Sequence, residues 1–484
     1  MSDPIRVRIP PSPTGNLHIG TARTALFNWL FARQNNGKII FRFEDTDRER
    51  SRKKFEENIL SGLEKLGIDF DEGPFHQSAR GEIYKKFCEK LIAEKKAYFC
   101  FCSPEKLEKI RAEQIAAKLP PRHDCDCAAK FDEKAAREKI QNGENFTIRF
   151  AVPKNREIIF HDLIRGEIKF STNEISDFII AKNFEHFLYN FCVVCDDAEM
   201  KISHVLRGED GISNTPKQIL IFEALNFPPP KFGHFPLILN AARAKLSKRD
   251  GATSVDDFLA AGFLPDALLN FLALLGFHPK NDREIFDRDF LLREFSLKKV
   301  HRAGAIFDLK KLEFLNNFYL KNLPREKLVE VCAPFFAAEK IEIADEKFAE
   351  NAIAAVREKA KTLAEIPEFA KFFFAKKLEI PRELFANEKM GVDLPAAKFA
   401  LNFAAEILRE IYFPVNGRLK PAVQKEDLQK IFIEKIAAAG KKNGEILWPV
   451  RVALSGEKFS PGVFEICEVL GAAESLRRIE SAIS

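Results

Sequence analysis

PSPTGNLHIG, residues 11–20, is the stretch that decides the fold, because it lies between a predicted strand and a predicted helix. Before it, apolar residues at positions 5, 7 and 9 alternate with arginines, which is typical of a strand with one apolar face. After it, apolar residues recur every three or four positions from Ala22 to Leu30, which predicts a helix that begins near Gly20 or Thr21. A second apolar run follows at 38–43. Together these segments predict a parallel strand–helix–strand unit.

The position of this loop predicts a ligand site. The loop after a first parallel strand lies at the carboxyl edge of the sheet, where open α/β folds bind ligands. Unpaired amides at the start of the next helix favour anions such as phosphates. Gly15 and Gly20 let a ligand approach the backbone, and His18 can donate a ring N–H to a phosphate oxygen. The alternative is a proline-rich turn with a surface histidine, which the complete pattern disfavours.

Length and composition narrow the class of protein. The 484 residues predict two to four cores, since domains cluster near about 100 to 200 residues. The net charge of +5 permits a polyanionic partner without requiring one, so local basic patches must carry any contact with nucleic acid. No apolar run reaches the roughly 18 residues that span a bilayer, and the N-terminus lacks a signal-peptide core. We therefore expect a cytoplasmic protein whose nine cysteines stay reduced or bind metal.

Two pairs of cysteines predict a metal site. Cys100 and Cys102 form the first pair, and Cys125 and Cys127 form the second. Four thiolates can hold a zinc ion in a closed tetrahedral site, which is the structural type. The alternative is four unrelated reduced cysteines, because such spacing is less diagnostic than Cys-x-x-Cys pairs.

The middle of the chain predicts an α/β insertion that splits the sheet domain. Strand-like segments at 146–152, 158–161 and 168–171 follow the cysteine pairs. The apolar run at 189–197 ends in two aspartates and predicts a further strand of the sheet domain, with Cys192 and Cys195 as core residues on opposite faces. We expect the last strand at 236–240.

The second half of the chain predicts a basic loop followed by helices. KLSKRDG, residues 245–251, is rich in lysine and arginine, and alone such a run is usually a solvated surface. Mobile lysines there can also follow charge that grows on leaving phosphate oxygens. The pattern from residue 256 to the C-terminus is almost wholly helical. Basic residues recur between 298 and 311, which makes this segment a local basic patch.

Several of these motifs together resemble one family. Ser12-Pro13-Thr14-Gly15 and His18-Ile19-Gly20 are similar to the HIGH-type signature of class I aminoacyl-tRNA synthetases, in the form of the bacterial glutamyl branch. The segments at 43–47, 189–197 and 204–210 resemble the same branch, and residues 245–251 resemble its KMSKS-type loop. Residues 448–465 resemble the end of its α-helical anticodon-binding domain, so the resemblance covers the whole chain.

The resemblance implies an activity and a set of site residues. It implies a ligase that activates L-glutamate with ATP and Mg²⁺ and transfers it to tRNA(Glu), with tRNA(Gln) as a second candidate acceptor. It implies His18, Lys245 and Lys248 as catalytic residues. The ATP-binding residues would be Thr14, Gly15, His18, Gly20, Lys245 and Lys248. The glutamate-binding residues would be Arg8, Ser12, Glu44, Tyr189 and Arg207, with the substrate's side chain assigned chiefly to Arg8.

The resemblance also implies zinc and an order of domains. Many relatives hold zinc in the insertion that contacts the tRNA acceptor end, often with histidine as last ligand, so His123 is the substitute if Cys127 is not used. We expect a Rossmann-type α/β catalytic domain with an α/β insertion, followed by all-α stem-contact and anticodon-binding domains, in a monomer. The predicted boundaries are 1–99 and 187–240 for the catalytic halves, 100–186 for the insertion, 241–323 for the basic loop and stem-contact domain, and 324–484 for the anticodon-binding domain.

Two other functions are compatible with parts of the pattern. A small-metabolite adenylyltransferase has a similar His-x-Gly loop, but it would leave the C-terminal half unused. A non-catalytic RNA-binding paralogue on a synthetase scaffold would not need His18 and Lys248, both of which are present.

Overall fold

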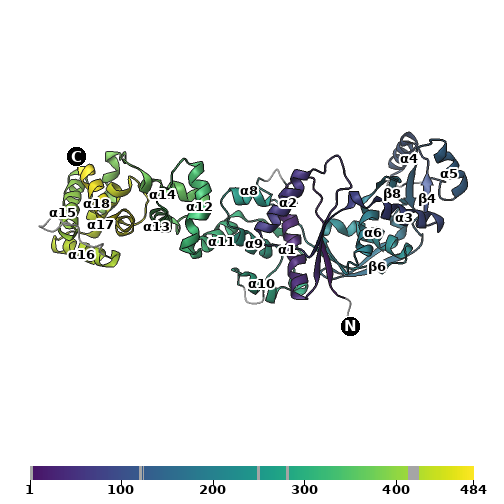
Figure 1. Cartoon of the computed structure of the whole chain (residues 1–484), viewed down its shortest axis with the longest axis horizontal. Helices are drawn as coiled ribbons and strands as arrows, with labels where there is room; N and C mark the ends of the chain where they lie inside the picture. Colours follow the sequence, from purple (N-terminus) through teal and green to yellow (C-terminus); the bar gives the residue numbers. More distant parts are fainter. Residues whose placement is uncertain are drawn as a thin grey trace. The chain divides into compact units, whose positions relative to one another are not determined.

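The structure is a computed structural model that describes residues 4–118, 123, 125–247, 251–279, 283–412 and 424–483. The chain forms two compact units, which Figure 1 colours along the sequence. The N-terminal unit comprises Met1–Ala260 and Pro265–Lys311, and the C-terminal unit comprises Ala261–Leu264 and Leu312–Ser484. The four domains predicted from the sequence, of which the catalytic domain is split into two segments, are a finer division, and their boundaries stay predictions.

The N-terminal unit contains the predicted strand–helix–strand unit. β1 (Arg6–Ile9) pairs in parallel with β2 (Lys38–Phe43), and α1 (Ile19–Gln34) connects them, so this prediction is confirmed. β3 (Glu72–His76), which the sequence did not predict, adds a third parallel strand beside β2. The loop between β1 and α1 therefore lies at the carboxyl edge of a parallel sheet.

A second parallel pair lies beside β1. β10 (His204–Gly208) pairs with β11 (Lys231–Phe235), and β1 packs against β10. Ser203 joins the two halves, because its backbone N–H donates to Arg6 O over 3.0 Å and its Oγ accepts from Arg6 N over 2.8 Å. The carboxyl ends of β1, β2 and β10 thus lie along one edge. β12 (Ile238–Leu239) pairs in parallel with β13 (Ala305–Ile306).

The helices of the N-terminal unit surround these strands. α1 is buried along most of its length because α9, α10 and β10 pack against it. The other described helices outside the predicted insertion are α2 (Lys53–Lys65), α3 (Gly81–Ala93), α6 (Tyr189–Glu199), α7 (Thr215–Ala224), α8 (Val255–Ala260), α9 (Pro265–Leu274), α10 (Arg288–Glu294) and α11 (Leu309–Asn322), the last of which continues into the C-terminal unit.

The predicted insertion forms a separate antiparallel sheet and a hairpin. The sheet has the order β4-β5-β8-β9, and β6 pairs with β7 in the hairpin. The strands are β4 (Ala97–Cys100), β5 (Thr147–Phe150), β6 (Glu157–Asp162), β7 (Gly166–Ser171), β8 (Phe178–Asn183) and β9 (His186–Phe187). α4 (Pro104–Ala116) and α5 (Glu133–Gln141) accompany them. The three strands predicted at 146–152, 158–161 and 168–171 are confirmed.

Residues 189–197 are a helix, so the predicted strand there is wrong. α6 is buried on most sides because α3, α7 and β8 pack against it. A helix buried all round shows no amphipathic period, and its sequence then looks like that of a buried strand. The prediction that Cys192 and Cys195 are core residues is confirmed, since both are fully buried. In a strand, residues three positions apart point to opposite faces. In the helix, Cys192 and Cys195 lie on the same face.

The predicted last strand is also displaced. The longer strand is β11 at Lys231–Phe235, and only Ile238–Leu239 of the predicted segment form a strand. β11 contains a glycine, a lysine and a histidine, which are weak strand signals. Burial beside β10 stabilises it regardless, because four of its five residues are buried.

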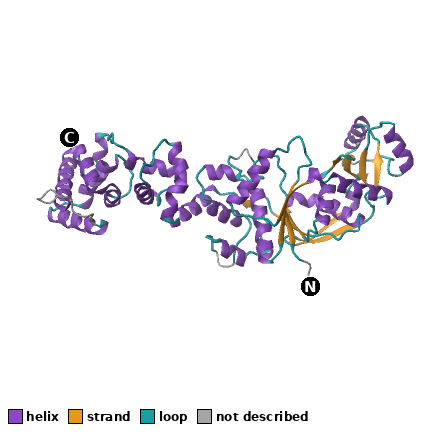
Figure 2. Cartoon of the chain, in the orientation of Figure 1, coloured by secondary structure: helices purple, strands orange, loops and turns teal. Residues whose placement is uncertain are grey.

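Helices are the main secondary structure in the described part of the C-terminal unit, as the sequence predicts (Figure 2). Its core forms where α15, α17 and α18 pack against one another. The helices are α12 (Leu328–Ala338), α13 (Glu346–Val356), α14 (Ile366–Phe374), α15 (Leu394–Tyr412), α16 (Lys425–Ala438), α17 (Asn443–Ser455) and α18 (Val463–Ile483). Among the described residues of both units, no helix has the length and apolar character needed to cross a membrane.

Candidate active site

The loop between β1 and α1 is fixed by hydrogen bonds from both flanking segments. Glu44 N, just after β2, donates to Pro11 O over 3.0 Å. Arg52 N, just before α2, donates to Pro13 O over 3.1 Å. Because both bonds use backbone atoms, the loop keeps its shape whatever its side chains contact. The loop backbone is therefore already in place at the carboxyl edge of the sheet.

His18 caps the first turn of α1. Its Nδ1 accepts a hydrogen bond from Gly20 N over 3.0 Å, which satisfies one of the unpaired amides at the helix start. A neutral ring that accepts at Nδ1 carries its proton on Nε2. Gly20 permits this cap, since a Cβ there would lie only 3.2 Å from His18 Nδ1. The prediction that His18 holds a donor N–H beside the helix start is consistent with this geometry.

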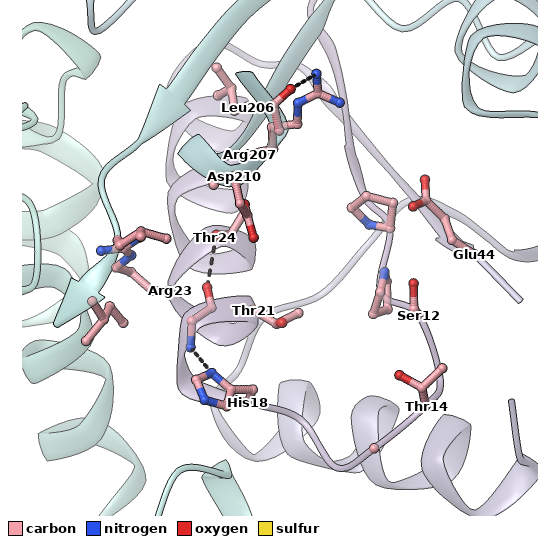
Figure 3. Close-up of a pocket in the computed structure, with 18 of the residues that line it drawn as sticks. Ser12, Thr14, His18, Thr21, Arg23, Thr24, Glu44, Leu206, Arg207 and Asp210 are labelled. Carbon is pink, nitrogen blue, oxygen red and sulfur yellow. Dashed lines mark hydrogen bonds between the residues drawn. The ribbon is translucent and has the colours of Figure 1, made fainter. Parts of the chain in front are cut away.

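A cavity of about 670 Å³ opens between this loop, α1 and the ends of β2 and β10. In Figure 3 Ser12 and Thr14 lie on one side of it, and His18, Thr21 and Thr24 lie along the helix on the other. It is lined by the predicted site residues Arg8, Ser12, Thr14, Gly15, His18, Gly20, Glu44, Tyr189, Arg207 and Lys245. Lys248 lies outside the described residues. Segments far apart in sequence thus meet in one cavity, although the role of each residue stays a prediction.

Five buried side chains form a charged cluster at one end of the cavity: Arg8, Arg42, Glu44, Asp196 and Asp197. Arg42 Nη2 donates to Asp197 Oδ1 over 2.8 Å and to Glu44 Oε1 over 3.3 Å. Arg8 Nε lies 3.6 Å from Asp197 Oδ2. Burial raises the pKa of Glu44, although the charges of Arg42 and Arg8 offset part of this effect. Arg8 and Glu44 reach the cavity, and Arg42 and the aspartates support them.

Asp196 anchors the charged cluster to α3 and to the turn before it. Its carboxylate accepts hydrogen bonds from Gln77 Nε2 over 2.8 Å, Arg80 Nε over 2.6 Å and Tyr84 Oη over 2.8 Å. Its Oδ2 also lies 3.5 Å from Arg42 Nε. A buried carboxylate with this many donors stays in one position, so Arg42 has little freedom to move.

Arg207 reaches the same cavity from the end of β10. Its Nη2 donates to Gly211 O over 3.0 Å and to Thr215 Oγ1 over 2.8 Å, and its Nε donates to His234 Nε2 over 3.1 Å. Its Nη1 contacts Tyr189 Oη at 3.4 Å. Burial lowers the pKa of Arg207, which nevertheless stays charged, because a guanidinium is not deprotonated in a protein at ordinary pH.

The opposite end of the cavity is open to solvent. Lys245 Nζ contacts Asp210 Oδ2 at 3.1 Å, and the two side chains are 61% and 63% exposed. Thr14 is also exposed. We call Thr14 and Lys245 the open rim. A cation on this rim can rearrange at little cost, because a solvated ion pair contributes little stability.

A second cluster lies at the end of β4. The ligand atoms of Cys100, Cys102, His123 and Cys125 all lie within 4.8 Å of one another. Cys127 is outside this set, although its Sγ lies 3.7 Å from Cys102 Sγ. Burial opposes ionisation of Cys100, but a hydrogen bond with His123 lowers the pKa of its thiol to about 5. Three thiols and one imidazole are donors that suit a closed zinc site, so the substitute ligand His123 fits the cluster better than Cys127.

Comparisons with known proteins bear directly on this arrangement. A family model described as "tRNA synthetases class I (E and Q), catalytic domain" matches residues 4–314, and one described as "Anticodon binding domain" matches residues 327–483. A protein named glutamate–tRNA ligase from Thermodesulfovibrio yellowstonii is 43% identical over 484 residues, which cover 99% of each chain. One of that name from Geobacter sulfurreducens is 40% identical, over 100% of this chain and 99% of its own.

The chain belongs to the class I tRNA synthetases, in the family of the glutamate–tRNA ligases. Solved structures agree with this assignment. The crystal structure of a glutamate tRNA ligase from Elizabethkingia meningosepticum, in complex with its amino acid, matches with a TM-score of 0.87 and 31% identity over 99% of each chain. A glutamate-tRNA synthetase structure from Elizabethkingia anophelis matches with a TM-score of 0.84. The predicted class I catalytic domain and helical anticodon-binding domain are confirmed.

Sequence reasoning missed part of this synthetase site. Arg42 lies in the apolar run at 38–43 and was given no role, and Asp196 and Asp197 were identified only as two carboxylates at the end of a predicted strand. Their signal was available, since a buried arginine requires carboxylate partners. His234 gave no comparable signal, because it contacts Arg207 only after β10 and β11 pair.

Proposed function

We propose that the protein joins L-glutamate to tRNA(Glu) in two steps. In the first, an oxygen of the substrate's α-carboxylate attacks the α-phosphorus of ATP, and the bond to pyrophosphate breaks, which gives glutamyl-adenylate. In the second, a hydroxyl of the terminal adenosine of tRNA attacks the carbonyl carbon, the ester forms and AMP leaves. The family assignment supports this activity, together with the shared name of relatives matched over nearly the whole chain.

The charge of the buried end of the cavity suits glutamate. Arg8, Arg42 and Arg207 are opposed there by Glu44 and Asp197, which leaves one formal positive charge, while Asp196 is balanced by Arg80. Glutamate at neutral pH carries one ammonium and two carboxylates, and hence one net negative charge. We assign its side-chain carboxylate to Arg8, its α-carboxylate to Arg207 and its ammonium to Glu44. Ser12 and Tyr189 would complete the pocket. This charge balance is the observation that carries the proposed substrate.

The loop and the open rim suit the phosphates of ATP. The start of α1 presents amides and a positive dipole end, and Gly15 and Gly20 keep the backbone accessible. We propose that Thr14 and His18 Nε2 contact the phosphates, and that Lys245 and Lys248 stabilise the pyrophosphate oxygens as the bond breaks. An exposed lysine suits this role because it can follow the leaving group.

Magnesium would accompany ATP without a dedicated protein site. Among the described residues that line the cavity, the carboxylates are those of Glu44 and Asp210, and each already contacts a cation. Mg²⁺ commonly keeps several waters and binds substrate phosphates. Its contribution is to neutralise charge on the triphosphate, so the protein's own task is to align the α-phosphorus with the glutamate carboxylate.

We also propose one structural zinc ion per chain, held by Cys100, Cys102, His123 and Cys125. These residues link the end of β4 to the segment that follows α4, so the metal would order this part of the insertion. Such a site has no open position and supplies no chemistry to the reaction. We propose further that the enzyme is a cytoplasmic monomer and that tRNA(Gln) is the acceptor to be tested beside tRNA(Glu).

Charging assays test the proposal directly. Purified protein with ATP and radiolabelled glutamate should esterify tRNA(Glu), and parallel reactions with tRNA(Gln) define the range of acceptors. Pyrophosphate exchange that requires glutamate and is supported by added tRNA should accompany charging. Exchange and charging that both stay at background would contradict the activity and favour a non-catalytic RNA-binding paralogue. Exchange with another small metabolite in place of glutamate would favour the adenylyltransferase alternative.

A further inference from the structure

A buried chain of hydrogen bonds links the β6–β7 hairpin to the cavity through His234. His234 Nδ1 lies 2.6 Å from Asp162 Oδ2, and both side chains are fully buried. On its other side, His234 Nε2 lies 3.1 Å from Arg207 Nε. Asp162 ends β6 and His234 lies in β11, so three separate segments form the chain. None of the proposed reaction steps uses Asp162 or His234.

The neighbours of His234 determine where its proton lies. Arg207 Nε can only donate a hydrogen bond, so His234 Nε2 must accept and carry no proton. An ionised carboxylate can only accept, so His234 Nδ1 must donate to Asp162. Both requirements select the same neutral tautomer. Burial lowers the pKa of His234, which agrees with a neutral ring.

Asp162 is itself held in one orientation. Its Oδ1 accepts from Ile164 N over 3.0 Å, Arg165 N over 2.9 Å and His234 N over 3.3 Å, which leaves Oδ2 for the imidazole. Burial raises the pKa of Asp162, but these bonds and the one from His234 bring it below its ordinary value. The carboxylate is therefore ionised and can serve only as an acceptor.

The surroundings leave Arg207 a single position. Its Nε and Nη2 are used by His234, Thr215 and Gly211, so only the Nη1 side remains directed at Tyr189 and the cavity. A Cβ at residue 211 would collide with the guanidinium, so Gly211 provides the space that the side chain occupies. Without the bond to His234, Arg207 Nε would lose its partner and the guanidinium group could rotate.

We propose that His234, oriented by Asp162, is a positioning residue that aims Arg207 at the α-carboxylate of the substrate. This inference rests on the proposed binding of glutamate by Arg207. It means that the β6–β7 hairpin contributes to amino-acid binding, although neither Asp162 nor His234 lines the cavity. The hairpin is secured beside β11, because Leu163 N donates to Phe232 O over 2.9 Å and Arg165 forms an ion pair with Glu209.

The sharpest test is Asp162→Asn. The three backbone N–H groups require an acceptor at the position of Oδ1, so the new amide nitrogen must take the position of Oδ2. His234 Nδ1 then has to accept, and its proton moves to Nε2, which lies 3.1 Å from Arg207 Nε and 3.2 Å from Thr215 Oγ1. A protonated Nε2 can donate to the Thr215 hydroxyl, but it can no longer accept from Arg207. The loss of one hydrogen bond to a charged group corresponds to a change of about ten- to hundredfold. We expect the KM for glutamate to rise by this factor in tRNA-supplemented pyrophosphate exchange, while the KM for ATP changes less than about twofold.

Three further variants separate positioning from a structural role. Glu167→Gln removes the same charge from an exposed position on β7 and should leave both KM values unchanged. His234→Gln keeps a group that can accept from Arg207 and donate to Asp162, so it should retain a lower glutamate KM than His234→Leu, which keeps neither. Because glutamine carries the same α-carboxylate, its activation should weaken in Asp162→Asn by about the same factor as that of glutamate.

The outcomes distinguish this inference from the proposed function. Wild-type protein without glutamate-dependent exchange would overturn the proposed function and with it the premise of this inference. Active wild-type protein combined with an unchanged glutamate KM in Asp162→Asn and His234→Leu would overturn the positioning role alone. Equal increases in the KM for glutamate and for ATP would also overturn it, since they would indicate general damage to the cavity.

Discussion

The two ends of the cavity differ in how far their charges are fixed before a substrate arrives. In the charged cluster, Arg8 and Glu44 are 1% and 8% exposed and contact buried partners. On the open rim, the side chain of Lys245 is 61% exposed and forms an ion pair with Asp210, whose carboxylate is equally solvated. A fixed, desolvated charge discriminates between ligands of different charge. A mobile charge can instead move toward the charge that develops on a leaving group. We therefore expect the cluster to select the amino acid and the rim to govern turnover.

The largest expected effect comes from removing the arginine of the charged cluster that reaches the cavity. Arg8→Ala should reduce glutamate activation by about a hundredfold or more, because loss of one partner of a buried charged pair costs about 2–5 kcal/mol. The measurement is kcat/KM for glutamate in tRNA-supplemented pyrophosphate exchange. Arg6→Ala is the matched control on β1, since Arg6 pairs with Glu72 rather than lining the cavity. A tenfold or smaller loss in Arg8→Ala would remove Arg8 from the proposed pocket.

Substitution of the lysines in the loop at 245–251 should affect a different kinetic parameter. Lys245→Ala and Lys248→Ala should each lower kcat by about tenfold or more and change the KM for ATP much less, because their charge is needed most as pyrophosphate leaves. Lys231→Ala, an exposed lysine at the start of β11, is the control. If only the KM for ATP rose, the lysines would be ordinary contacts to bound ATP, and the contrast between the two ends would fail.

The cysteine cluster should act on tRNA and leave both ends of the cavity intact. None of its four residues lines the cavity. Protein purified without chelator should contain about one zinc per chain, and the double substitution Cys100→Ser with Cys102→Ser should lose it. We expect the KM for tRNA to rise several-fold, while the KM values for ATP and glutamate stay within about twofold. Cys467→Ser, a buried cysteine of the C-terminal unit, is the control. Metal analysis without zinc in the wild type would contradict this site.

The smallest expected effect is a pH dependence of glutamate binding. Burial raises the pKa of Glu44, so this carboxylate takes up a proton at a higher pH than an exposed glutamate does. The ionised form is the one that attracts the ammonium of the substrate. The KM for glutamate should therefore rise a few-fold as the pH falls through this raised pKa, and in Glu44→Gln it should be higher and flat over the same range. Parallel profiles for the wild type and Glu44→Gln would show that Glu44 does not bind the ammonium.

The sequence predicted the fold where local patterns carry the information. The alternation before residue 10 and the helical spacing after residue 20 were sufficient for the β1–α1–β2 unit. The pattern failed at α6, because a helix buried on most sides lacks an amphipathic period. It failed again at β11, where a glycine and two basic residues lie in a strand that tertiary packing stabilises.

The residues of the candidate site also fall into those that local motifs predicted and those that they did not. The residues on motif loops, such as His18 and Lys245, were predictable because their motifs are local and specific, and the structure brings them to one cavity. The supporting residues Arg42, Asp162 and His234 were not identified, since their partners lie 155, 72 and 27 residues away in sequence. A single sequence does not record such pairings, because they arise only when the strands assemble.

The most direct test of this account measures the preference for glutamate over glutamine, which share a shape and differ in the charge of the side chain. The ratio of kcat/KM for the two amino acids should be determined by tRNA-supplemented pyrophosphate exchange for wild type, Arg8→Ala and Lys245→Ala. We predict that the ratio falls by at least about tenfold in Arg8→Ala, because glutamine cannot make the lost interaction, and that it stays at the wild-type value in Lys245→Ala. An unchanged ratio in Arg8→Ala, or an equal fall in Lys245→Ala, would contradict the assignment of selection to the charged cluster and of turnover to the open rim.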